Sequence, residues 1–278
     1  MTVGIGAICE ADSEEPKVIV AADRLVTSGI AARREYEHTS SKMTGICGSD
    51  NGDPCVAVAV GAGSVSLADE VFYKTRQSVA NDNPNTVRGI AKHATKAMQE
   101  MVKETIERQV LSQYDLSLNE FNNIQGQMNA QIVSAIYEEI TSTQDEIFSQ
   151  VNILFAGVDH RGAHLFTVSN NDMARHDSIG YKTVGSGAEP ARSAFIRNRF
   201  DDSCEVSDAL LEVTEAKIQS EEAQGVGSEM DISVLNEDGR QDLDEDVDEL
   251  RDIYEEVLKA ERKAREEAME ENKYTFGT

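Results

Sequence analysis

The sequence predicts a soluble α+β protein in which antiparallel β-hairpins alternate with blocks of helix. Two observations predict this class. Short apolar runs are joined by clusters of turn-forming residues, which is typical of hairpins, and longer helix-forming segments separate these runs. At 278 residues, 40% of them hydrophobic, the chain is long enough to bury a sizeable core.

The first predicted strand covers residues 2–9 and reads TVGIGAIC. Successive side chains on a strand point to opposite faces, so Thr2 shares its face with Gly4 and Gly6. Because glycine carries no side chain, this pattern predicts open space beside the Thr2 hydroxyl.

The second predicted strand is VIVAAD at 18–23, which follows the polar turn segment ADSEEPK. We expect the two strands to form an antiparallel hairpin in which Cys9 pairs with Val18. This register sets Gly4 opposite Asp23. It therefore brings the carboxylate of Asp23 close to the start of the chain.

A second hairpin is predicted from KMTGIC at 42–47 and CVAVAVG at 55–61, which the turn formers GSDNGDP separate. Pairing the two cysteines that flank this turn places Lys42 beside Val60 and Gly61. We expect the two hairpins to lie side by side in one sheet. Their open ends then meet, and Lys42 and Gly61 come close to Thr2.

These residue types fit a nucleophile at the chain terminus. A threonine hydroxyl needs a base, and in a chain that begins with threonine the α-amino group, with a pKa of about 7.7–8.0, can serve. Lys42 would stabilise the developing alkoxide, and Asp23 would orient Lys42 and keep it charged. The backbone N–H of Gly61 would stabilise the oxyanion. Removal of Met1 would therefore make Thr2 an N-terminal nucleophile.

Several stretches resemble the proteasome β-type subunits and their relatives HslV and Anbu, which are N-terminal-nucleophile (Ntn) hydrolases. The resemblance covers about residues 2–236 and includes VNILFAGVDHRGAHLFTVS, VGSGAEPA and MDISVLN. It places the family's site pattern on Thr2, Asp23, Thr27, Gly29, Lys42 and Gly61. It also places Ser186, in the GSG turn, near the site.

The resemblance implies a four-layer αββα sandwich, the Ntn-hydrolase fold, in which two antiparallel sheets lie face to face with helices outside. The expected helices span about 65–80, 86–108, 128–148, 188–200 and 207–222. The domain is expected to cover 1–236, and 237–278 to form an acidic helical tail. We expect the tail to be a charged helix laid across the body, with an oligomer or partner contact as the alternative.

The resemblance implies a threonine-type peptidase or amidohydrolase that acts on a peptide or protein through an acyl-enzyme ester on Thr2. It also implies a homo-oligomer and leaves an ATPase partner open. Three alternatives remain: a non-catalytic scaffold like the proteasome α subunits, a threonine-dependent peptide ligase, and a stand-alone small-amide hydrolase of the same superfamily.

The chain departs from the family before its last strand and in a long central insertion. The family's Asp and Ser positions fall on Ala223 and Val226, so we expect Glu222 or Ser228 to replace them. Residues 108–150 are longer than the family's connection and predict an added helical insertion over one face. Its sequence SLNEF predicts a capping box between Ser117 and Glu120.

The formal net charge of −25 makes nucleic acid and anionic lipid poor partners. Arginine outnumbers lysine, and the acidic residues are spread along the chain, which favours a halophilic, archaeal protein. No apolar run approaches the ~20 residues of a membrane span, and no secretion signal precedes the first strand. These observations predict a cytoplasmic protein.

The cysteines and histidines predict no metal site and no cofactor. The four cysteines lack CxxC spacing, so we expect reduced thiols, mostly in the core. His160 and His164 straddle a tight turn, and both are expected to be exposed hairpin residues. No phosphate-binding glycine loop is present.

Overall fold

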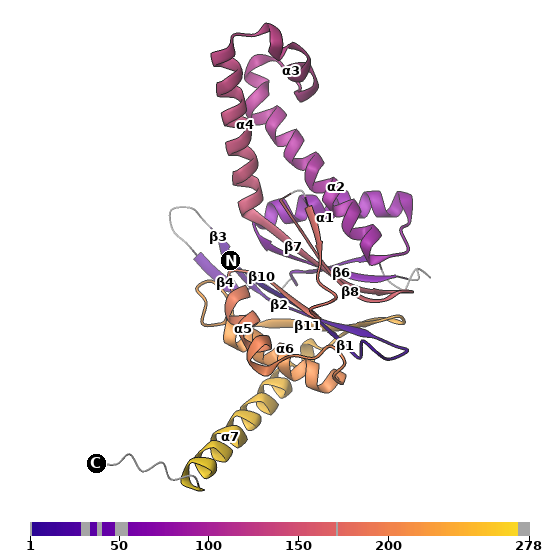
Figure 1. The fold of residues 1–278 in the computed structure, drawn as a ribbon, viewed down its shortest axis with the longest axis vertical. Coiled ribbons are helices and arrows are strands. Elements are labelled where there is room, and N and C mark those ends of the chain that lie inside the picture. Colours follow the sequence, from indigo (N-terminus) through magenta and orange to yellow (C-terminus); the bar gives the residue numbers. More distant parts are fainter. Residues whose placement is uncertain (1, 29–33, 38–40, 48–54, 171, 272–278) are drawn as a thin grey trace, which may run out of the picture.

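The computed structural model describes residues 2–28, 34–37, 41–47, 55–170 and 172–271, which form two five-stranded antiparallel sheets and one separate hairpin (Figure 1). The first sheet contains, in spatial order, β10 (Tyr181–Gly185), β1 (Val3–Cys9), β2 (Lys17–Asp23), β11 (Met230–Asn236) and β12 (Gly239–Asp242). The second contains β5 (Met43–Cys47), β6 (Val56–Gly63), β7 (Val151–Asp159), β8 (Gly162–Ser169) and β9 (Asp172–Arg175). The hairpin joins β3 (Leu25–Ser28) and β4 (Arg34–Glu37).

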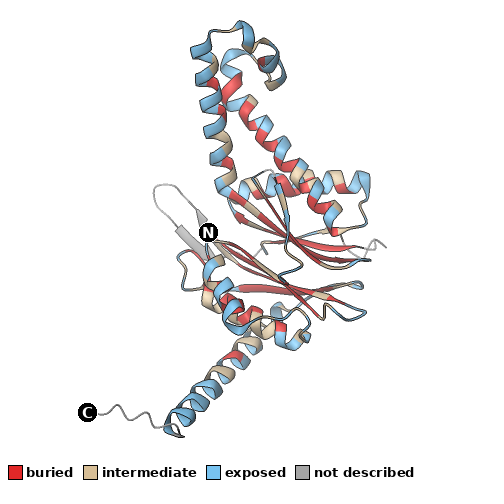
Figure 2. Cartoon of the chain, in the orientation of Figure 1, coloured by how far each residue is buried: buried red, intermediate tan, exposed pale blue. Residues whose placement is uncertain are grey.

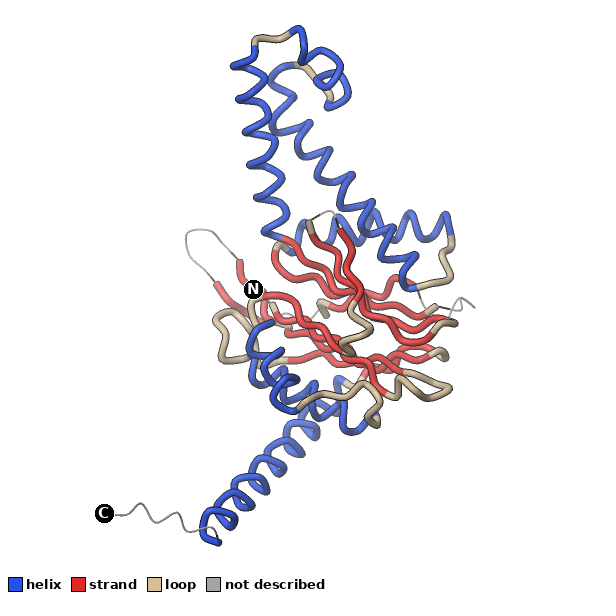
Figure 3. Tube along the Cα trace, viewed as in Figure 1, coloured by secondary structure: helices blue, strands red, loops and turns tan. Residues whose placement is uncertain are grey.

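Helices cover the outer face of each sheet. Helices α1 (Val65–Asp82) and α2 (Val87–Ile106) pack on the second sheet, and α5 (Ala188–Asn198) and α6 (Val206–Ser220) pack on the first. Figure 3 shows the resulting layers of helix, sheet, sheet and helix. The four-layer αββα sandwich is therefore confirmed, and these four helices begin within one residue of their expected starts.

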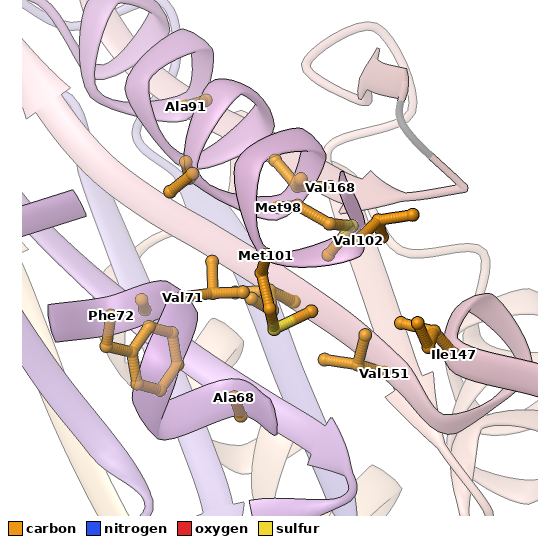
Figure 4. Packing of buried hydrophobic residues seen from close by; sticks show 14 of the residues in the cluster. Ala68, Val71, Phe72, Ala91, Met98, Met101, Val102, Ile147, Val151 and Val168 are labelled. Carbon is orange, nitrogen blue, oxygen red and sulfur yellow. The ribbon is translucent and has the colours of Figure 1, made fainter. Parts of the chain in front are cut away.

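Three buried apolar layers hold the four structural layers together (Figure 2). One layer joins α1 and α2 to the second sheet, and Figure 4 shows Phe72, Met98 and their neighbours in it. A second layer, which includes Val20, Val60 and Leu154, lies between the two sheets. The third joins the first sheet to α5 and α6. Each fully buried side chain of this size contributes about 1.5–3 kcal/mol of transfer free energy.

The first hairpin forms, but its predicted register is wrong by one residue. Cys9 pairs with Lys17, and Gly4 pairs with Ala22. Lys17 joins the strand because its ammonium forms an ion pair with Glu10 across the end of the hairpin. Residue 3, rather than residue 4, therefore lies beside the carboxylate at the end of β2.

The two hairpins do not share a sheet, contrary to the prediction. Strands β1 and β2 lie in the first sheet, and β5 and β6 lie in the second. Each hairpin has an apolar inner face, and stacking face to face buries both faces at once. The predicted space along the Thr2 face is also absent, because a Cβ on Gly4 would lie 2.7 Å from Val60 Cγ1 of the facing sheet. Gly4 thus allows close packing between the sheets.

The register of the second hairpin differs from the prediction by one residue at its open end and by two near its turn. Met43 pairs with Val60, whereas the predicted pairing of the two cysteines sets Lys42 opposite Val60. A bulge after Gly45 then pairs Cys47 with Ala57, whereas the predicted partner was Cys55. The turn at 48–54 lies outside the described residues.

The predicted insertion forms a helical arm made of the residues from 107 to 150. It contains a π-helical segment η2 (Glu107–Leu111), the 3-10 turns η3 (Ser112–Tyr114) and η4 (Gln125–Gln127), and the helices α3 (Leu118–Ile124) and α4 (Ala130–Gln150). The predicted capping box between Ser117 and Glu120 is confirmed. Figure 1 shows that the arm rises away from the sheet, so the expectation that it covers one face was wrong. Phe121 on α3 and Ile136 on α4 are buried within the arm, where they form part of its apolar core.

The acidic tail begins as part of the first sheet. Strand β12 pairs with β11, so the predicted boundary after residue 236 lies inside a hairpin. A 3-10 turn η5 (Asp244–Asp246) leads into α7 (Val247–Glu271). The start of α7 packs on α6 and buries Tyr254, but the rest projects from the body (Figure 1). A helix laid across the body was therefore the wrong expectation, because the later turns of α7 are mostly charged and exposed.

Of the four cysteines, Cys9 and Cys55 are buried, and Cys47 and Cys204 are half-buried. Within the described ranges, no helix has the length and apolarity needed to cross a membrane, and no cluster of potential metal ligands is found. His160 is exposed as predicted, but His164 is buried, which corrects the prediction for that residue. Its ring lies between Asp159 and Asp177, whose carboxylates compensate for burial of the imidazole.

Candidate active site

Thr2 lies where three strand ends of the first sheet meet. It directly precedes β1, and the antiparallel neighbours of β1 end at Gly185 in β10 and at Asp23 in β2. Thr2 is only 4% exposed. The register of the sheet therefore brings the ends of β10 and β2 to the first residues of the chain.

The GSG turn after β10 binds both backbone groups of Thr2. The Thr2 nitrogen donates to Ser186 Oγ at 3.2 Å, and Ser186 Oγ in turn lies 3.3 Å from the Thr2 carbonyl oxygen. Gly187 N–H donates to the same carbonyl. Gly185 has φ +93°, and a Cβ there would lie 2.1 Å from the Thr2 carbonyl oxygen, so only glycine fits.

Lys42 connects the two sheets at this point. Its ammonium nitrogen lies 2.9 Å from Thr2 Oγ1 and 3.0 Å from Asp23 Oδ1. It also donates to the carbonyl oxygen of Leu25. The side chain of Lys42 is 11% exposed and that of Asp23 is fully buried, so this ion pair is weakly screened by solvent. The predicted convergence of Thr2, Asp23 and Lys42 is present in the structure.

Asp23 is held by backbone donors from three segments. Val3 N–H donates to Oδ1 at 2.9 Å, and Leu25 N–H donates to Oδ2 at 3.2 Å. Gly227 N–H, from the loop after α6, donates to Oδ2 at 3.3 Å. With Lys42, this carboxylate has four donors on its two oxygens, which fixes its orientation and supplies a counter-charge to the ammonium.

Gly61 occupies a different environment from the other predicted site residues. It lies in the interior of β6 and pairs with Ile153. A Cβ there would point to the outer face, 2.8 Å from Ala68 Cβ on α1. Glycine is thus needed at this position for helix packing, and its role as an oxyanion donor stays a prediction.

The loop before the last strand carries the departures from the family pattern. Val226 is buried and packs against Gly187, whereas Glu222 and Ser228, the expected replacements, are exposed. Gly29 and the side chain of Thr27 lie outside the described residues. The loop contributes its backbone N–H at Gly227 instead of a side-chain carboxylate or hydroxyl.

Sequence reasoning missed a buried lysine behind this loop. Lys217, on α6, is fully buried and donates to the carbonyl oxygen of Gly227 at 2.8 Å. One signal in the sequence was available: Lys217 lies four residues after Val213 and follows Ala216, both of which are on the buried face of α6.

The arrangement presents a threonine hydroxyl, an ammonium group within hydrogen-bond distance of it, and a buried carboxylate that orients the ammonium. The Thr2 nitrogen is a peptide nitrogen in this chain, and after removal of Met1 it would be an α-amine beside Ser186. Hydroxyl, amine, ammonium and carboxylate are the groups that acyl transfer needs for nucleophile, base and charge stabilisation.

Comparison with known proteins shows similarity at the level of structure. No protein-family model matches the chain, and a search of curated proteins finds no match. The solved structure of an Anbu (Gly-1) mutant from Hyphomicrobium sp. strain MC1 is similar, with a TM-score of 0.61 and 13% sequence identity. The similarity covers 96% of this chain and 97% of that one. The chain therefore has the fold of the Anbu structure, a four-layer sandwich of two sheets between helices.

Proposed function

We propose that this protein is an N-terminal threonine hydrolase that cleaves peptide amides through an ester intermediate on Thr2. One observation carries the proposal: the Lys42 ammonium lies 2.9 Å from Thr2 Oγ1 and 3.0 Å from Asp23 Oδ1. The fold of the Anbu structure supports it independently.

In the proposed reaction, Thr2 Oγ1 attacks the carbonyl carbon of the substrate amide. The hydroxyl proton passes to the α-amine of Thr2, directly or through a water molecule. The amine then protonates the leaving nitrogen as the C–N bond breaks, and an ester on Thr2 remains. Water attacks that ester, releases the carboxylic acid and restores the hydroxyl, so atoms and protons balance.

Each neighbouring group has a distinct part in this scheme. Lys42 stabilises negative charge on Oγ1 as the proton leaves, and Asp23 holds Lys42 in place. Ser186 Oγ orients the amine and relays protons to it. The N–H of Gly61 is proposed as an oxyanion donor. We further propose that the protein acts as a homo-oligomer, for which the exposed apolar side chains Ile132 and Tyr137 on the helical arm offer a contact surface.

The test is a measurement of the N-terminus together with covalent labelling. Intact mass of the purified protein is expected to show loss of Met1, and a β-lactone probe is expected to add one acyl group at Thr2. A Thr2→Ala variant, which keeps the chain length, is the control and is expected to remain unlabelled. An active protein that retains Met1 would refute the mechanism.

Product analysis separates hydrolysis from its alternatives. Peptide substrate is expected to give a free carboxylic acid even with an added amine acceptor. Transfer to that acceptor would indicate a peptide ligase, and turnover of small amides alone would indicate a small-amide hydrolase. A scaffold predicts no labelling at all, even when Thr2 carries a free amine.

A further inference from the structure

We propose that Lys217 is a positioning residue of this reaction, which holds the backbone of Gly227 in place so that its N–H supports Asp23. The inference rests on the function proposed above. If Lys217 has this role, the residues that support the site include Lys217 near the C-terminal end of α6 and Arg251 in the acidic tail.

Lys217 is an unusual residue for its position, because its side chain is fully buried. Its three N–H donors match three acceptors: Glu221 Oε1 at 2.7 Å, the Gly227 carbonyl at 2.8 Å and the Ser228 carbonyl at 3.5 Å. Buried ammonium groups are rare unless they are paired in this way. Burial lowers the pKa of Lys217, while the hydrogen bond and charge of Glu221 oppose that shift.

The contact between Lys217 and Asp23 passes through a single residue. Lys217 binds the carbonyl of Gly227, and the N–H of the same Gly227 donates to Asp23 Oδ2. Asp23 in turn binds Lys42 through its other oxygen. The hydrogen bond from Lys217 therefore restrains the peptide of Gly227, whose N–H is one of the donors that orient the Asp23 carboxylate.

The acidic tail shares this network. Arg251, on α7, donates to Glu221 Oε1, which is the oxygen that also accepts from Lys217. Arg251 also binds the carbonyl of Ser228. The charged groups that face the Lys217 ammonium are thus Glu221, which directly follows α6, Arg251 from α7 and Asp23 from β2. Through Arg251, the first turns of α7 brace the loop that carries Gly227.

The positioning role is tested in the full-length protein with Lys217→Met, which keeps the unbranched apolar part of the side chain and removes its charge and donors. We expect kcat for a fluorogenic peptide to fall about 10- to 100-fold, because a small displacement of a supporting group costs this much. KM is expected to change by less than about threefold, because the network does not bind substrate. The matched control is Lys259→Met on α7, whose exposed ion pairs lie outside the network, and it is expected to keep wild-type rates.

The pH dependence of kcat/KM distinguishes positioning from a purely structural role. Lys217→Met removes a cation close to the site, which favours the protonated form of the Thr2 α-amine, the proposed base. The acid limb of the profile is therefore expected to move to higher pH. Unchanged kinetics, or a lower rate with an unmoved acid limb, would overturn the proposal.

Two further measurements keep the proposal testable under other outcomes. If Lys217→Met does not fold, Glu221→Gln retains the lysine and weakens its pairing, and it is expected to show the same changes at smaller size. Wild-type behaviour of Glu221→Gln would then refute the role.

If the wild-type protein shows no labelling or turnover, the proposed function fails, and a crystal structure of a folded variant decides this inference. Loss of the contact between Gly227 N–H and Asp23 would support positioning, and its retention would refute it.

Discussion

Replacing Asp23 with asparagine tests how the buried carboxylate supports the site. The two oxygens of Asp23 divide four donors: Oδ1 accepts from Val3 and Lys42, and Oδ2 accepts from Leu25 and Gly227. An asparagine amide has one oxygen, so in either orientation its NH₂ group faces two donors that lose their acceptor. Lys42 also loses its counter-charge. Breaking such a buried pair costs about 3–5 kcal/mol, which is the expected loss in the free energy of unfolding.

The effect of Asp23→Asn on catalysis is expected to exceed what stability alone explains. The Lys42 ammonium would lose the group that directs it to Thr2 Oγ1, and stabilisation of the developing charge would weaken. We expect kcat to fall by about 10²–10³, as when one charge-stabilising donor is removed. The assays are peptide turnover and β-lactone labelling at a temperature where urea denaturation shows the variant fully folded.

Asp159→Asn is the matched control for this experiment. Asp159 is also buried and accepts from two backbone N–H groups, those of Val87 and Arg161. Strand β7 begins near the site at Val151 and ends at Asp159, eight residues later. Asp159 therefore lies roughly 25 Å along the sheet from the site. The control should lose a comparable amount of stability and keep its activity. Equal loss of activity in both variants, or wild-type turnover in Asp23→Asn, would refute the placement of Lys42 by Asp23.

Three other predictions concern the nucleophile, pH and salt. Lys42→Ala should abolish labelling of Thr2 while circular dichroism shows a folded protein, and near-wild-type turnover would contradict the proposed role. Burial alone would lower the pKa of His164, but hydrogen bonds and charges from Asp159 and Asp177 outweigh it and raise the pKa to about 9. Because this value exceeds the unfolded value of about 6.5, the His164 contribution to stability is complete below that pH and is lost as pH rises through about 9. Urea unfolding between pH 6 and 10 should show this decline, and His164→Gln should flatten it. Finally, the net charge of −25 predicts a melting temperature that rises between 0.1 and 2 M KCl, and a flat response would remove the halophilic, archaeal interpretation.

Much of the fold follows from local sequence patterns. Apolar runs and turn formers located β1, β2 and β6, and the SLNEF pattern located the start of α3. These signals are short-range, because a strand or a helix start depends on neighbouring residues. The site residues Thr2, Asp23 and Lys42 were reached in the same way, since each lies at a strand end where the register of a hairpin limits its neighbours.

The errors have a common physical cause, which is that they depend on how strands pair and stack, and a short run of sequence does not fix this. Thr2 and Lys42 were expected to meet within one sheet, but they meet across two sheets because stacking buries both apolar faces. His164 was expected to be exposed because its local sequence is a polar turn. Its burial depends on Asp177, which the register of the β8–β9 hairpin brings to the imidazole ring.

The sequence by itself determined that a threonine, a carboxylate and a lysine lie at the open ends of two hairpins. Tertiary structure alone decided that Gly227 donates to Asp23, and that Lys217 and Arg251 support the loop around it. The physical reason is that burial of a charge depends on its complete set of partners. The partners of Lys217 are Glu221, directly after α6, and two carbonyl groups of the loop before β11. Arg251 of α7 binds the same Glu221 carboxylate, and no local sequence pattern predicts that these segments meet.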